Sequence, residues 1–163
     1  MTKIAILSDI HGNMTAFSAV LKDAQAHHAD EYWFLGDLFL PGPGAAKLWD
    51  RLHALPLTHL VKGNWDDDLF WVLDGPVDLN QPTDVYFSRL VAYLWPQLNA
   101  DILTAIRHWP LHEVFEQDGL TISLAHNLPT SNHGHRLYPD QPQSNFDQIA
   151  PDPKIDVAIY GHT

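Results

Sequence analysis

The chain has 163 residues, 45% of them hydrophobic, which is enough for one domain with a buried core and excludes a disordered protein. It contains no cysteine, so disulfide bonds and thiolate metal ligands are excluded, and a reducing, cytoplasmic location is expected. The net charge of −11 disfavours a surface for long nucleic acid, although bound divalent ions would still permit a phosphate substrate.

The first part of the chain alternates short apolar runs with helical patterns. Helical spacing of apolar residues predicts a helix over 14–28, with Asn13 as its N-cap, and a shorter helix near 45–54. The apolar runs are bounded by Gly, Asp and Asn, and they predict buried strands at 3–7, 32–35 and 58–62. This βαβαβ order predicts a parallel sheet covered by helices, and therefore the α/β fold class.

Residues 66–110 depart from this rhythm. They contain helical patterns separated by Pro76 and Pro82, and we interpret them as a helical cap inserted into the domain. No internal repeat, low-complexity tract or flexible linker divides the sequence, so we expect residues 1–163 to form a single domain.

The last part of the chain returns to strands. An Asp-Gly pair predicts a hairpin between strands near 113–116 and 120–124. A proline-rich loop then leads to a final strand at 156–160. The chain stops soon after this strand, and we expect it to be a shortened form of a longer protein.

Five apolar runs are followed by side chains of the kind that bind metal ions. In α/β sheets, sites lie outside the carboxyl ends of the strands, so side chains placed there are expected to converge. Hard divalent ions prefer carboxylate and amide oxygens, and transition metals prefer imidazole. The sequence offers both kinds in Asp9, His11, Asp37, Asn64, His126 and His162.

Each of these residues also has an ordinary structural explanation. Asp9 and His11 could form a turn that caps the next helix, and Asp37 and Asn64 follow glycines that are common in turns. The chain has eleven histidines, and a single one such as His126 is more often structural than metal-bound. The joint pattern favours a metal site. An aspartate in such a set can bridge two ions, one oxygen on each, at the ~3.5–4 Å separation of two-metal hydrolytic sites.

The motifs resemble those of the calcineurin-like metallophosphoesterases, and most closely their small bacterial phosphodiesterase branch. They run in the family's order: Asp-x-His at 9–11, Gly-Asp at 36–37, Gly-Asn-x-Asp at 63–66, a lone histidine at 126, and Gly-His at 161–162. The resemblance implies a ββ-sandwich flanked by helices (αββα), here lacking its C-terminal part.

The resemblance also implies a role for each residue. Asp9 and His11 would bind a first metal ion, Asp37 would bridge both ions, and the second ion would be completed by Asn64, His126 and His162. The residues implied in catalysis are Asp37, Asn64, Asp66 and His126. The cofactors would be two divalent ions, with manganese expected first and iron, zinc, nickel or magnesium as alternatives.

One implied ligand is missing from the printed sequence. The family motif ends in Gly-His-x-His, and the second histidine, a ligand of the first metal, would fall just beyond Thr163. We therefore expect the first metal to be held by too few ligands here, and the chain as it stands can be inactive.

The implied function is hydrolysis of phosphodiester or phosphoanhydride bonds in small molecules, nucleotides among them, by a hydroxide that two metal ions activate. Trp65 stands where many members carry a histidine that assists the leaving group. An indole cannot donate a proton at neutral pH, and losing a general acid costs ~10²–10⁴-fold in rate. Position 65 therefore favours leaving groups that are weak bases.

Two other functions are weighed against this one. A non-catalytic metal-binding scaffold of the same fold usually has eroded ligands, whereas every ligand position within this chain is filled. A nuclease acting on long DNA fits poorly with the acidic composition. The expected partner is a small phosphorylated substrate, with no membrane contact because no apolar run approaches a membrane span or signal peptide; a homo-oligomer is possible.

Several other residues allow two interpretations. His133 and His135 could contact substrate phosphate or donate a proton, but solvated loop histidines are at least as common. Asp67 and Asp68 fit the acidic start of a solvated helix better than a site role, whereas the family motif favours the site for Asp66. Aromatic residues of the cap could stack on a base, or form core or a subunit interface: Trp71, Tyr86, Phe87, Tyr93 and Trp95.

Overall fold

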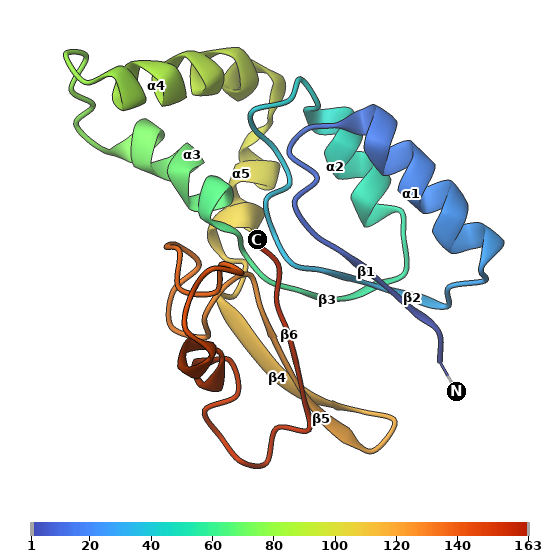
Figure 1. Ribbon diagram of the computed structural model, residues 1–163. Helices are drawn as coiled ribbons and strands as arrows, with labels where there is room; N and C mark the ends of the chain where they lie inside the picture. The colour runs from blue at the N-terminus through green and yellow to red at the C-terminus, as the bar shows by residue number, and fades with distance from the viewer. Residues whose placement is uncertain (1, 163) are drawn as a thin grey trace.

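The computed structural model describes residues 2–162, in which two small sheets pack face to face and helices cover the outer face of one of them (Figure 1). The first sheet is parallel, in the order β1-β2-β3. Its strands are β1 (Ile4–Leu7), β2 (Glu31–Phe34) and β3 (Leu57–Leu60). The connecting helices are α1 (Met14–Ala26) and α2 (Ala46–His53). The βαβαβ unit expected from the sequence is therefore confirmed, with strand ends shifted by a residue or two.

The second sheet is mixed, in the order β4-β5-β6. The strands β4 (His112–Gln117) and β5 (Leu120–Ala125) form the expected antiparallel hairpin. After a long loop that contains the 3₁₀ helix η2 (Gln143–Gln148), β6 (Val157–Ile159) pairs with β5 in parallel. The carboxyl ends of β5 and β6 therefore point in the same direction.

Alternation along β2 assigns its side chains to two cores. Because successive strand residues point to opposite faces, Tyr32 and Phe34 pack against the helices, while Trp33 packs between the sheets. The ring of Trp33 makes an edge contact with Phe115 of β4, at 5.0 Å between ring centroids. The two sheets are thus held together by apolar contact, which fixes their strand ends relative to each other.

The segment expected to form a cap contains α3 (Asn64–Asp74), α4 (Pro82–Leu94), η1 (Trp95–Gln97) and α5 (Ala100–Arg107). Pro82 is the first residue of α4, where its missing N–H costs no hydrogen bond, so the proline begins this helix. Ile106 of α5 is fully buried in the same core as Leu52 of α2. Only α3 and α4 project outward (Figure 1), whereas α5 belongs to the main layer of helices.

The cap also begins earlier than position 66. Helix α3 starts at Asn64, directly after the loop that follows β3, so a candidate metal ligand occupies its first turn. None of the helices within residues 2–162 is long and apolar enough to cross a membrane.

Candidate metal centre

All six candidate ligands lie just beyond the ends of strands, as the sequence predicts. Four of them have left-handed backbone angles: Asp9, His11, Asp37 and His162, with φ between 50° and 67°. Such angles cost about 1–3 kcal/mol for a residue other than glycine, and they persist only where the surroundings impose them. Here neighbouring loops impose them, because Asp9 N–H donates to Gly36 O at 3.1 Å and His11 N–H donates to Asp37 O at 2.9 Å.

The loop after β2 and the start of α3 touch through two glycines. Gly36 has a φ of +94°, and a Cβ built on it would collide with the backbone of Gly63. A Cβ on Gly63 would in turn collide with the carboxylate of Asp37. Only glycine at both positions lets Asp37 approach Asn64.

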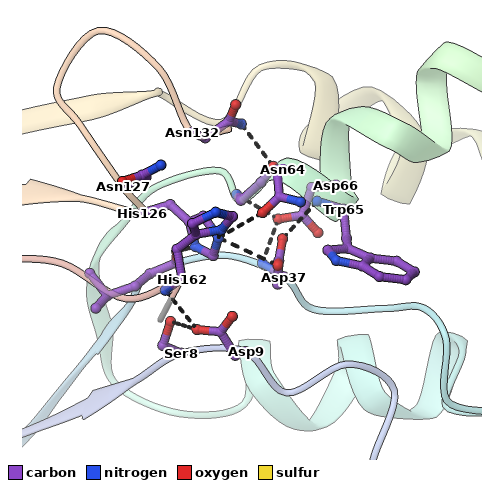
Figure 2. Close-up of polar contacts among 12 residues, drawn as sticks. Ser8, Asp9, Asp37, Asn64, Trp65, Asp66, His126, Asn127, Asn132 and His162 are labelled. Atoms are coloured by element: carbon purple, nitrogen blue, oxygen red, sulfur yellow. Dashed lines mark hydrogen bonds and ion pairs between the residues drawn. The ribbon is translucent and has the colours of Figure 1, made fainter. Parts of the chain in front are cut away.

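The six side chains form one connected cluster, of which Figure 2 labels Asp9, Asp37, Asn64, His126 and His162. His11 Nε2 lies 3.7 Å from Asp9 Oδ1 and 3.6 Å from Asp37 Oδ2. His126 Nε2 lies 3.4 Å from the same Asp37 Oδ2 and 3.0 Å from Asn64 Oδ1. His162 Nδ1 is 3.1 Å from His126 Nε2. Asp37, buried with 1% of its surface exposed, therefore lies between the two predicted ligand sets.

Backbone carbonyl groups orient all three imidazoles. The Nδ1–H of His11 donates to Leu40 O and that of His126 donates to Leu35 O, each at 2.6 Å. His162 is reversed, since its Nε2–H donates to Gly134 O at 2.9 Å. Each ring therefore presents its other nitrogen to the cluster, which is how protein histidines are arranged around metal ions.

This arrangement fits a cation. With the tautomers above, His126 Nε2, Asn64 Oδ1, His162 Nδ1 and Asp37 Oδ2 all present lone pairs, at separations of 3.0–3.4 Å around His126. Lone pairs that face one another repel unless a proton or a metal ion lies between them. Among the described residues, ligand atoms of Asp9, Asp37 and His126 all lie within 4.8 Å of one another. The donor set therefore matches divalent ions that accept both oxygen and imidazole nitrogen.

The pKa values of His11, His126 and Asp9 are also consistent with a site that favours positive charge. Burial lowers the pKa of His11, but donation of a hydrogen bond to the carboxylate of Asp9 and the charge of Asp37 raise it to about 9. Burial also opposes protonation of His126, and contact with Asp37 nevertheless raises its pKa. Burial raises the pKa of Asp9, whereas hydrogen bonds with His11 and Ser8 lower it to about 2. Without a metal ion, protons on His11 and His126 thus balance the negative carboxylates, whereas burial and the charge of His126 lower the pKa of His162.

Asp66 lies behind Asp37 and faces the backbone. Its carboxylate accepts N–H groups of Asp37 at 2.8 Å, Leu38 at 3.1 Å and Gly63 at 2.9 Å. Burial and the nearby charge of Asp37 raise the pKa of Asp66 above its usual value. The sequence placed Asp66 among the catalytic residues, whereas its contacts are those of a residue that holds the Asp37 loop against α3.

Asp37 and Trp65 are joined through the backbone. The N–H of Trp65 donates to Asp37 Oδ1 at 2.8 Å, which leaves Oδ2 as the oxygen that faces both imidazoles. The indole of Trp65 packs edge-on against His11, with ring centroids 5.3 Å apart, and against Phe87 of α4. Trp65 therefore closes one side of the cluster with an apolar ring.

The loop after β5 holds two buried asparagines to which the sequence analysis gave no role. Asn127 Nδ2 donates to His133 O at 2.9 Å and Gly134 O at 3.0 Å. Asn132 Nδ2 donates to Gly63 O at 2.9 Å. Their signal in the sequence is weak, because asparagine in a glycine-containing loop is typical of any turn.

The structure separates the residues that allowed two interpretations. Trp71, Phe87 and His133 line a cavity of about 520 Å³ between α3, α4 and the loop after β5. Tyr93 and Trp95 are about half exposed and are not among the residues that line this cavity. His135 is exposed and stacks on Tyr138.

Comparisons with known proteins identify relatives of this fold. A family model described as the calcineurin-like phosphoesterase superfamily domain matches residues 2–163. Among solved structures, a metallophosphoesterase from Sphaerobacter thermophilus is 27% identical, with a TM-score of 0.60. It aligns over 82% of this chain and 50% of its own. A search of curated protein sequences found no significant match.

A second solved structure supports the fold alone. A hypothetical protein from Pyrococcus horikoshii OT3 is 18% identical, with a TM-score of 0.67, and aligns over 93% of this chain and 65% of its own. The present chain thus spans half to two-thirds of the length of these two proteins.

Proposed function

We propose, from the premise that this chain belongs to the calcineurin-like phosphoesterase superfamily, that it is part of a metal-dependent hydrolase of phosphate esters. The proposed substrates are phosphodiesters or phosphoanhydrides of small molecules, nucleotides among them. The observation that carries the proposal is the cluster of facing lone pairs around Asp37 Oδ2, which lies between His11 and His126.

Each candidate ligand has a proposed role in this function. Asp9 and His11 hold one divalent ion, Asn64, His126 and His162 hold a second, and Asp37 is shared. Trp65 N–H donates to Asp37 Oδ1, and Asp37 Oδ2 faces both His11 and His126, so Asp37 would be the ligand shared by the two ions. When bound, two such ions supply an activated water and polarise the phosphoryl oxygens. Manganese is the ion that we propose first.

The remaining residues of the centre act on geometry and solvent access. Asp66 holds the Asp37 loop against α3 through three backbone N–H groups. The carbonyl groups of Leu35, Leu40 and Gly134 fix the three imidazoles. The indole of Trp65 excludes water from the side of His11. These contacts keep the ligands in position before substrate arrives, which spares the reaction a reorganisation cost.

The proposed function is tested by metal content and turnover together. Protein loaded with manganese is expected to retain metal after gel filtration and to hydrolyse bis(p-nitrophenyl) phosphate, with Asp37→Asn as the inactive control. A scaffold would retain metal and show the same background rate as Asp37→Asn. Loss of metal on gel filtration together with absence of turnover would contradict the proposed metal centre itself.

A further inference from the structure

Position 65 supplies no general acid for the leaving group, because it is a tryptophan. The loop after β5, however, places a histidine near the metal centre. The loop after β5 is tied to the metal centre at two points, through Asn127 and Asn132. Asn127 is fully buried and directly follows the candidate ligand His126, and Asn132 binds the carbonyl group of Gly63, directly before Asn64 (Figure 2). His133 lies in this loop between Asn132 and Gly134, and its side chain is therefore held beside α3.

His133 contacts Asp68, which lies one helical turn from the candidate ligand Asn64 on α3. Its Nε2 is 3.5 Å from Asp68 Oδ1. Asp68 follows Asn64 by four residues on α3, so the two side chains share one face of that helix, with Cβ atoms ~5–6 Å apart. The imidazole of His133 therefore lies beside the N-terminal part of α3, which begins with Asn64.

The contacts of His133 favour protons on both of its ring nitrogens. Asn132 Nδ2 donates to Gly63 O and to Asp67 Oδ2, so the Oδ1 of Asn132 is left as an acceptor. His133 Nδ1, 2.7 Å from that oxygen, must then be the donor. Nε2 faces the carboxylate of Asp68, which also calls for a proton. The contacts describe an imidazolium, the form that can act as an acid.

The imidazolium faces a cavity of suitable size for a leaving group. The cavity of about 520 Å³ is lined by Asp68, Trp71, Phe87 and His133, among others. Phe87 contacts Trp65, with ring centroids 4.9 Å apart, so the cavity adjoins the wall of the metal centre. About half of the His133 side chain is exposed, so its imidazole is accessible to a group bound in the cavity.

We propose that His133, positioned by Asp68, is the general acid of the reaction and protonates the leaving group in this cavity. The inference rests on the proposed phosphoesterase function. A water oxygen forms a bond to phosphorus and gives up a proton to solvent, while the bond between phosphorus and the leaving oxygen breaks. The electron pair of the broken bond stays on the leaving oxygen, which takes the proton from Nε2 of His133. Neutral imidazole remains and is reprotonated from solvent. The departing group is an alcohol, such as the hydroxyl group of a nucleoside.

The charges around His133 favour the acid form at neutral pH. The contact with Asp68 raises the pKa of His133 against the opposing effect of burial, and the charges of Asp67 and Asp37 raise it further. Asp84 of α4 lines the same cavity, and Lys62, the nearby cation, is paired with Asp67. The acid is present below this raised pKa and is lost as the pH rises through it. Turnover of esters with basic leaving groups is therefore expected to fall on the alkaline side.

The test compares His133→Asn with His135→Asn, an exposed histidine of the same loop. On metal-loaded protein, rates are measured for methyl aryl phosphodiesters whose leaving groups range from nitrophenol to phenol. Wild type and His135→Asn are expected to show the same shallow dependence on the phenol's pKa. His133→Asn is expected to lose about 100-fold or more on the phenyl ester and little on the nitrophenyl ester. Trp65→His in the His133→Asn background is expected to recover part of the loss.

A second measurement follows the imidazole itself. Heteronuclear NMR titration of the histidine rings is expected to give His133 a higher pKa than His135, and Asp68→Asn should lower the value for His133 alone. The same substitution should move the alkaline limb of the rate profile to lower pH. The role of His133 would be overturned if the rates of wild type and His133→Asn depended equally on the pKa of the leaving phenol. It would also be overturned if Asp68→Asn left the pKa of His133 unchanged. Absence of turnover in metal-loaded wild type would overturn the proposed function as well.

Discussion

The loops at the strand ends and the cap formed by α3 and α4 meet at Asn64, yet they are built on different principles. In the strand-end loops, backbone groups of one loop bind those of the next, and four candidate ligands are held at left-handed backbone angles. The cap consists of ordinary helices whose outer side carries exposed Tyr86 and Tyr93. The loops therefore tolerate little change, whereas the cap is free to vary at its surface and to shape the leaving-group cavity.

Removing the shared carboxylate of Asp37, which the strand-end loops hold in place, should have the largest effect on metal binding and turnover. Asp37→Asn is expected to weaken metal binding at both positions by more than about 100-fold and to abolish turnover, because Oδ2 faces both His11 and His126. Metal content per chain and calorimetric titration measure this. A variant that keeps full manganese-dependent turnover would show that Asp37 is only a turn residue.

Removing one ligand of the proposed second ion should have the next largest effect on metal binding. Asn64→Ala or His126→Ala is expected to weaken binding of one equivalent of metal while the other persists, because these two side chains contact each other and are proposed as ligands of the same ion. Calorimetry resolves the two equivalents. Unchanged stoichiometry and affinity would mean that both residues are structural.

The support of the Asp37 loop can be tested through stability. Asp66→Asn is expected to lower the free energy of unfolding by about 3 kcal/mol, because an amide cannot accept all three backbone N–H groups that the carboxylate accepts. Denaturant unfolding measures the loss. Asp101→Asn, an exposed acidic residue in the first turn of α5, serves as the matched control and should change stability by less than about 0.5 kcal/mol.

The pH dependence of metal binding should follow from the imidazoles. The pKa of His11 is raised to about 9, so at pH 7 this ring carries a proton that must leave before Nε2 can bind a metal ion. Apparent affinity should therefore rise with pH, about tenfold per unit for each proton released, and level off above the raised pKa. Calorimetry in buffers of different ionisation enthalpy counts the protons. Binding without proton release would contradict the assignment of His11.

The smallest effect is expected on the outside of the cap. Tyr93→Ala removes a ring that is 55% exposed, and it should change stability and metal binding by less than about 0.5 kcal/mol. Phe87→Ala, on the inner side of the same helix, should change the leaving-group preference. If Tyr93→Ala and Phe87→Ala changed the leaving-group preference equally, the two sides of α4 would not differ in function.

The sequence by itself determined the parallel βαβαβ unit, the hairpin and the family, because these depend on local periodicity and on motifs such as Asp9 to His11 and Gly63 to Asp66. It also selected the six side chains that the structure brings together. Their metal binding stays a prediction. The bounds of the expected cap were less accurate, because the burial of Ile106 in the same core as Leu52 of α2 depends on long-range packing that helical periodicity does not report.

Only the tertiary structure decided how these side chains are held. The carbonyl groups that orient His11, His126 and His162 belong to residues 28 to 91 positions away, and every residue type has a carbonyl group, so no sequence pattern marks them. The position of His133 beside Asp68 likewise depends on a loop that crosses to α3 from the second sheet. Sequence records which chemical groups are present, while packing between distant segments decides which of them face each other.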